Sequence, residues 1–169
     1  DGYIAGGAGI DTSGIYLFRR YVIMKIDFDG NLVWWKAYGE DFQDWYNGGP
    51  RSLIKTSDGG FLLAGSILHY DIGKSVGLLM KFDSNGDTLW TSKLEDNQVP
   101  GYNYGGFRVC LQLADNGYIV SGNRRTGPND YDLWVIRTDS QGSEIWTQLY
   151  NCGEADWFEQ GISISILPD

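Results

Sequence analysis

The sequence predicts an all-β protein built from one antiparallel, four-stranded unit that is repeated along the chain. An eight-residue phrase occurs three times, and its tryptophans, Trp34, Trp90 and Trp146, follow one another at 56-residue intervals. The composition agrees, because 24 glycines, 7 tryptophans and 11 tyrosines favour strands and turns. No segment has helical periodicity of useful length.

The repeated phrase reads as a tight turn followed by a strand. Its copies are DFDGNLVW, DSNGDTLW and DSQGSEIW, which begin at Asp27, Asp83 and Asp139. We expect the Asp to accept backbone hydrogen bonds and the Gly to adopt positive φ, which together build the turn. The Trp is then an apolar anchor that packs one unit on the next, in preference to a ligand contact.

Two more phrases recur with nearly the same spacing and supply further strands. One contains GYIAGG (Gly2–Gly7), GGFLLAG (Gly59–Gly65) and NGYIVSG (Asn116–Gly122). The other precedes it, as PRSLIKTSD (Pro50–Asp58), FRVCLQLAD (Phe107–Asp115) and ISISILPD (Ile162–Asp169). Asp/Asn-Gly turns between apolar runs indicate hairpins. Each unit therefore reads as two hairpins whose four strands are neighbours in chain order.

Four-stranded antiparallel units with a period of about 40–60 residues are typical of β-propeller blades. We expect one partial propeller domain over residues 1–169, with repeats at 1–57, 58–114 and 115–169. A propeller needs about four to eight blades to close, and this chain supplies three. Two interpretations stay open. Either the chain is a piece of a longer propeller, or two copies form a six-bladed homodimer in which Ile162–Leu167 of each chain completes the other's first blade.

Three segments, DGGFLLAG, LLMKFDSNGDTLW and DLWVIRTDSQGSEIW, carry a pattern found in a known family. The chain resembles a β-propeller repeat of secreted and surface proteins, common in Bacteroidetes-type bacteria, with the consensus DGGYIVAGS…DVWLIKLDSNGNLLWQKTYGG. YGEDFQDWYNGGPRSLIKTSDGG is similar to that family's connector between blades. The resemblance covers nearly the whole chain. It implies an extracellular or cell-surface location and implies no catalytic residues.

Charge and hydropathy exclude several kinds of partner. The net charge of −9 and the pI of about 4.4 argue against nucleic acid, whose phosphates require a basic face. They also argue against anionic membrane surfaces. No apolar run approaches the roughly 20 residues of a spanning helix, so we expect no membrane insertion.

The strand order places the hairpin turns on one rim of the domain and the long connections on the other. Loops on a rigid scaffold commonly hold binding sites, so the long-loop rim is the expected ligand face. The candidate ligand-binding residues are Asp41, Asp44, Trp45, Asp96, Tyr102, Tyr104, Arg124, Arg125, Asp156 and Trp157. Trp45 and Trp157 recur at matched places, which favours packing between blades for these two. Tyr102, Tyr104 and the two arginines do not repeat. Residues that the scaffold requires should recur in every blade, so these four are the better candidates for ligand binding.

The sequence gives no reason to expect a catalytic or metal site. The turns at Asp27 and Asp83 are similar to calcium loops but lack the Glu that an EF-hand places twelfth. His69 is the only histidine, and neither a convincing Ser-His-Asp set nor H-E-x-x-H is present. Carboxylates on the loop rim leave glycoside chemistry as an alternative. We therefore expect no enzyme, no cofactor and no bound metal.

The two cysteines, Cys110 and Cys152, are expected to be free thiols. Cys110 falls in the first strand of its unit and Cys152 follows the fourth. Three strand spacings of about 4.8 Å separate such positions, so their Cα atoms should lie about 14 Å apart. A disulfide tolerates a Cα separation of only about 7 Å. We expect Cys110 to be buried.

Together these observations predict a non-catalytic, exported module that binds a protein partner or the rest of its own propeller. Two alternatives remain. One is a carbohydrate-binding propeller that uses the rim tyrosines, and the other is a fragment of a larger propeller enzyme.

Overall fold

The computed structural model describes residues 1–11, 18–39, 49–69, 74–95, 105–151, 153 and 158–167, and these residues form an all-β fold without helices. The first sheet contains β1 (Tyr3–Asp11), β2 (Phe18–Ile26) and β3 (Leu32–Tyr38). The second contains β4 (Gly49–Lys55), β5 (Phe61–His69), β6 (Lys74–Phe82) and β7 (Thr88–Leu94). The third contains β8 (Gly105–Gln112), β9 (Tyr118–Arg125), β10 (Tyr131–Thr138) and β11 (Glu144–Tyr150).

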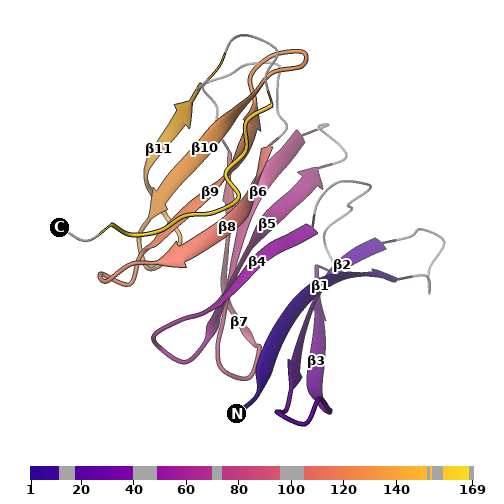
Figure 1. The fold of residues 1–169 in the computed structure, drawn as a ribbon. Helices are drawn as coiled ribbons and strands as arrows, with labels where there is room; N and C mark the ends of the chain where they lie inside the picture. Colours follow the sequence, from indigo (N-terminus) through magenta and orange to yellow (C-terminus); the bar gives the residue numbers. More distant parts are fainter. Residues whose placement is uncertain are drawn as a thin grey trace.

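The order of strands in each sheet is the predicted one. Every strand pairs antiparallel with its neighbours in sequence, so that the second sheet runs β4-β5-β6-β7 and the third β8-β9-β10-β11. Each sheet is open. In Figure 1 the sheets follow one another side by side, from indigo through magenta to orange. Contacts of β1 with β4 and of β5 with β8 join each sheet to the next.

The three hairpin turns have the geometry that their sequence predicts. In each, the first Asp accepts hydrogen bonds from the backbone N–H groups two and four residues later, at 2.8–3.0 Å. The pKa of Asp27 is lowered, first by a hydrogen bond from the Asn31 side-chain amide and then by these backbone bonds, which also lower the pKa of Asp83. The Gly three residues after the Asp has φ between 77° and 87° in Gly30, Gly86 and Gly142. The repeated phrase is therefore a turn-forming device.

Two of the three repeated tryptophans, Trp34 and Trp90, pack their sheet on the next, as expected. A Cβ added to Gly86 would lie 2.8 Å from Cη2 of Trp34, and one added to Gly142 would lie 2.5 Å from Cζ3 of Trp90. Hydrogen bonds reinforce the same contacts. The Tyr38 hydroxyl donates to the Gly86 carbonyl at 2.6 Å, and the Ser92 hydroxyl donates to the Gly142 carbonyl at 2.7 Å.

The second sheet is buried on both faces, which explains why β5 is apolar at most of its positions. Side chains alternate across a strand, so Leu62 and Leu63 belong to different cores. Leu62 and Leu79 pack with residues of the third sheet, including Val120. Leu63 and Leu78 pack towards the first sheet, where Tyr21 and Ile23 are buried.

The expected strand at Ile162–Leu167 is absent, which corrects the sequence prediction for that segment. A parallel bridge joins Phe158 to Tyr131, and the Gly161 N–H donates to the Gly122 carbonyl at 2.9 Å. Beyond Gly161 the described residues have no strand partner, and Ile162 is 73% exposed. A strand needs neighbouring backbone groups for its ladder, and the sequence pattern alone does not supply them.

Cys110 is buried and free, as predicted. Burial raises the pKa of its thiol to about 11. Cys152 lies outside the described residues, so the free state of its thiol stays a prediction. Within the described residues, no helix is long and apolar enough to cross a bilayer.

Candidate functional site

The structure describes only two of the ten predicted ligand-binding residues. Arg124 and Arg125 end strand β9. The remaining eight lie outside the described residues, namely Asp41, Asp44, Trp45, Asp96, Tyr102, Tyr104, Asp156 and Trp157. Most of the long-loop rim therefore stays a prediction.

The two described arginines have different surroundings. Arg124 is 1% exposed, and its guanidinium carbon lies 5.7 Å from the centroid of the Trp134 ring. Arg125 is half-buried and donates from Nε to the Gly127 carbonyl at 2.9 Å, which braces the β9–β10 connection. These contacts are structural, and the ligand role of both residues stays a prediction.

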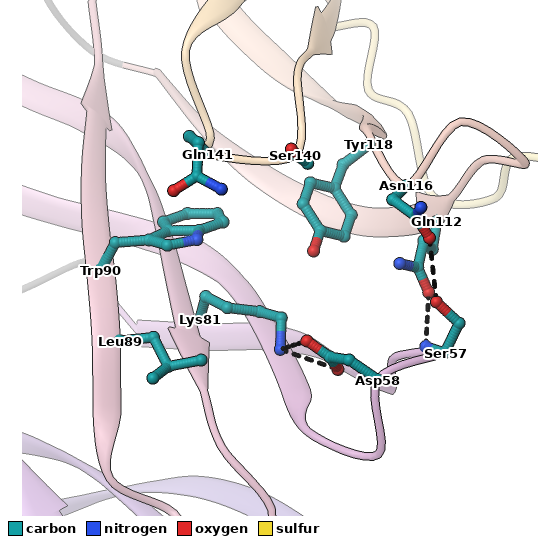
Figure 2. A pocket seen from close by; sticks show the side chains of 10 residues that line it. All are labelled: Ser57, Asp58, Lys81, Leu89, Trp90, Gln112, Asn116, Tyr118, Ser140 and Gln141. Atoms are coloured by element: carbon teal, nitrogen blue, oxygen red, sulfur yellow. Dashed lines mark hydrogen bonds and ion pairs between the residues drawn. The ribbon is translucent and has the colours of Figure 1, made fainter.

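A pocket of about 500 Å³ lies between the second and third sheets, on the rim that carries the hairpin turns. We call it the junction pocket (Figure 2). The second sheet contributes Ser57, Asp58, Lys81, Leu89 and Trp90. The third sheet contributes Gln112, Asn116, Tyr118, Ser140 and Gln141. Its volume falls within the range of about 300–1,000 Å³ that is usual for ligand sites.

An ion pair forms one wall of the junction pocket. The Lys81 ammonium is buried at 2.8 Å from the Asp58 carboxylate and also donates to the Phe82 carbonyl at 3.1 Å. The hydrogen bond from Lys81, together with that from Thr56, lowers the pKa of Asp58 to about 2. An equivalent pair joins Asp115 to Arg137 in the third sheet. Because it recurs, we assign this pair to the scaffold, where it ties the hairpin turn to the third strand.

Two amide side chains, those of Gln112 and Asn116, lie beside this ion pair, and Ser57 fixes their orientation. The backbone N–H of Ser57 donates to Oε1 of Gln112 at 2.8 Å, and its hydroxyl lies 3.0 Å from Oδ1 of Asn116. Since a backbone N–H can only donate, the Gln112 oxygen faces Ser57 and the NH₂ group faces away. Figure 2 shows both amides at the edge of the open space.

Two aromatic rings also line the pocket. The centroids of Trp90 and Tyr118 are 6.0 Å apart, with the ring planes at 57°. Tyr118 is almost wholly buried, and desolvation raises its pKa to about 12, so the phenol is protonated at neutral pH. In Figure 2 its hydroxyl points into the space between Trp90, Lys81 and Asp58.

A second candidate surface is the outer face of the third sheet near β11. Trp146 is 39% exposed, and its neighbour Ile145 is 57% exposed. The matched tryptophans Trp34 and Trp90 are partly buried against the following sheet. We call the exposed surface around Ile145 and Trp146 the end face. It is apolar and carries the side chain that elsewhere anchors a neighbouring sheet.

The part of the chain that the structure describes contains no group of three or more His, Cys, Asp or Glu residues placed to hold a metal ion. A scan against protein-family models and a search of the curated proteins found no match to this chain.

Sequence reasoning did not select the junction pocket, because it favoured the long loops over the hairpin turns. A signal was nevertheless present. At the positions matched to Gln112, Asn116 and Tyr118, the second sheet has Lys55, Gly59 and Phe61. Departures from the repeat at three neighbouring positions mark this junction as different from the first.

Proposed function

We propose that the protein is a non-catalytic binding and scaffolding module of an exported β-propeller. Three similar sheets stack on one another, and the same contact joins each to the next: a tryptophan lies beneath the turn glycine of the following sheet. Such repetition propagates from sheet to sheet, and each sheet interacts mainly with its neighbours. The fold thereby presents loops and end surfaces on a rigid frame.

The exposure of Trp146 is the observation that carries this proposal. In the first and second sheets the matched indole lies under Gly86 or Gly142, but Trp146 has no such cover among the described residues. A large exposed indole beside Ile145 costs hydrophobic free energy that burial would recover. The partner that fits this face is a further four-stranded sheet of the same design, which would place its own turn glycine over Trp146.

An extended chain tests the stacking role directly. Residues 116–169 are appended after Asp169, so that Ile162–Leu167 becomes the first strand of a fourth sheet. Trp146→Ala is then compared in the original and extended chains by urea unfolding. We expect a loss below about 1 kcal/mol in the original chain and about 3 kcal/mol in the extended one, because burial makes truncation costly.

Trp90→Ala is the matched control, since Trp90 lies beneath Gly142 in both chains. It should destabilise both by a similar amount, about 3 kcal/mol. An equal cost of Trp146→Ala in the two chains would contradict the proposal, because the appended sheet would then not cover that indole.

Carbohydrate binding is a second candidate function. The junction pocket supports it, since aromatic faces and amide groups meet there in a concave site. The chemistry of the pocket defines the class of sugar more narrowly.

A further inference from the structure

We propose that the junction pocket binds a neutral sugar ring. This inference concerns a different surface from the end face, so either proposal can fail without the other. Four features of the pocket support it: its hydrogen-bonding groups, its charge, its aromatic rings and its departure from the repeat.

Several donors in the pocket are unused within the described residues. The Tyr118 hydroxyl and the Trp90 indole N–H form no hydrogen bond with another described residue. The NH₂ groups of Gln112 and Asn116 are equally available, because their oxygens already face Ser57. Polar groups that converge on one cavity fix the orientation of a ligand. Four donors around one space suit a ligand that is rich in oxygen acceptors.

The charges of the pocket favour a neutral ligand. Among the described residues that line it, Asp58 and Lys81 are the only charged ones, and each neutralises the other at 2.8 Å. A charged ligand would lose its hydration without gaining an unpaired countercharge, which is unfavourable. A hydroxyl, in contrast, exchanges bonds to water for bonds to the amides and the phenol at little net cost.

The aromatic rings favour a ring-shaped ligand with an apolar face. Trp90 and Tyr118 meet at 57° and form a corner, not a parallel slot. A flat aromatic ligand would fill a slot best, whereas a puckered pyranose has one face of C–H groups and a rim of hydroxyls. Such a ring can lay its C–H face on the indole while its hydroxyls reach the Tyr118 hydroxyl and the amides.

The first junction supplies an internal comparison. Phe61 takes the place of Tyr118 there, and Gly59 takes the place of Asn116. Packing needs are common to both junctions, since both keep the tryptophan beneath the turn glycine. The second junction has gained a hydroxyl and an amide that this packing does not require. Residues that depart from a repeat in the direction of added polarity are consistent with ligand recognition.

The test titrates the protein with a panel of methyl pyranosides, namely those of glucose, galactose, mannose and N-acetylglucosamine. Binding is followed by saturation-transfer NMR and by the fluorescence of Trp90, with Trp90→Phe identifying its signal. Methyl glucuronide and glucosamine serve as anionic and cationic probes. We expect at least one neutral glycoside to bind with a Kd no weaker than about 10 mM, and the charged probes to bind less well.

Tyr118→Phe and Asn116→Gly rebuild the lining of the first junction and so preserve a packing that the chain already tolerates. Each should weaken binding about tenfold, the effect expected for one lost hydrogen bond to a ligand hydroxyl. Asn85→Ala, at the first-junction position matched to Gln141, is the control and should leave the affinity unchanged. Thermal unfolding confirms that each variant is folded.

Three results would overturn the proposal. The first is that no neutral glycoside of the panel binds at about 10 mM. The second is equal binding by the folded Tyr118→Phe and Asn116→Gly variants, which would place the sugar elsewhere. The third is tighter binding of a charged probe, which would assign the pocket to a different ligand class.

Discussion

Two residues of the repeated phrase, the Asp and the Gly, determine the conformation of the hairpin turn. The Asp satisfies two backbone N–H groups of the turn, and the Gly supplies positive φ at no steric cost. The same glycine also leaves room for the tryptophan of the preceding sheet. A single residue thus serves both the turn and the packing between sheets, and substitutions can separate these two roles.

Gly142→Ala should destabilise the protein more than Gly30→Ala. Both glycines have positive φ, so an added Cβ costs each about 1–2 kcal/mol of backbone strain. At Gly142 the new methyl group would also meet Trp90, whereas at Gly30 nothing lies within 4 Å. Overpacking adds about 1–3 kcal/mol. Urea unfolding measures the difference, and equal losses would show that the indole does not occupy the position described here.

The Asp58–Lys81 pair should make stability depend on pH in acid. The pKa of Asp58 is lowered from its ordinary value of 3.8 to about 2 in the folded state. A depressed folded pKa contributes stability above pH 3.8, and this contribution is lost as the pH falls towards about 2. Because the Asp58 side chain is 55% exposed, we expect a modest effect.

Urea unfolding between pH 5 and pH 2, about the range in which carboxylates titrate, measures this effect. Asp58→Asn should flatten the pH dependence, although it also lowers stability at every pH by leaving Lys81 buried without its carboxylate. Asp29→Asn is the control, because its exposed carboxylate forms no hydrogen bond or ion pair with another described residue. An unchanged slope in Asp58→Asn would contradict the role of the ion pair.

At the scale of the element, the middle sheet joins two cores through adjacent residues. Leu78 and Leu79 are both fully buried on β6, yet Leu78 packs towards the first sheet and Leu79 towards the third. This division follows from side-chain alternation along a strand. Substitutions at these two neighbouring positions therefore probe the two different cores.

Leu78→Ala and Leu79→Ala should each cost about 2–5 kcal/mol, because both leave a cavity in a packed core. Their local consequences should differ. Hydrogen exchange should accelerate mainly in β2 for Leu78→Ala and mainly in β9 and β10 for Leu79→Ala. Peptide-level mass spectrometry measures this, and one shared exchange pattern for both variants would argue against two separate cores.

At the scale of the whole molecule, the end face and the net charge have opposite effects on association. The charge of −9 at pH 7 keeps copies apart, while exposed Ile145 and Trp146 favour contact. Near the pI of about 4.4 the repulsion disappears. We expect sedimentation velocity to show more association near that pH than at pH 7.

Trp146→Glu should reduce this association, because it places a charge on the end face. Phe28→Glu is the control, since Phe28 is an exposed aromatic residue on the β2–β3 turn. If both variants associate as the unchanged protein does, the end face is not the contact surface.

The sequence by itself determined the repeating unit, its turns and the order of its strands. Those features depend on local chemistry: an Asp that accepts nearby N–H groups, a Gly at positive φ, and apolar runs of strand length. The anchoring role of the tryptophans could also be predicted, because a shared residue at a fixed interval indicates a shared packing need.

Only the tertiary structure decided that Ile162–Leu167 has no strand partner among the described residues and that the junction pocket lies on the turn rim. Both features depend on whether segments that are distant in the sequence lie side by side in the fold. Gln112 and Ser57 meet because separate sheets stack, and no local rule relates residues 55 positions apart. The conformation of a turn depends on neighbouring residues in the sequence, whereas a binding surface forms only when the packing of whole sheets brings its parts together.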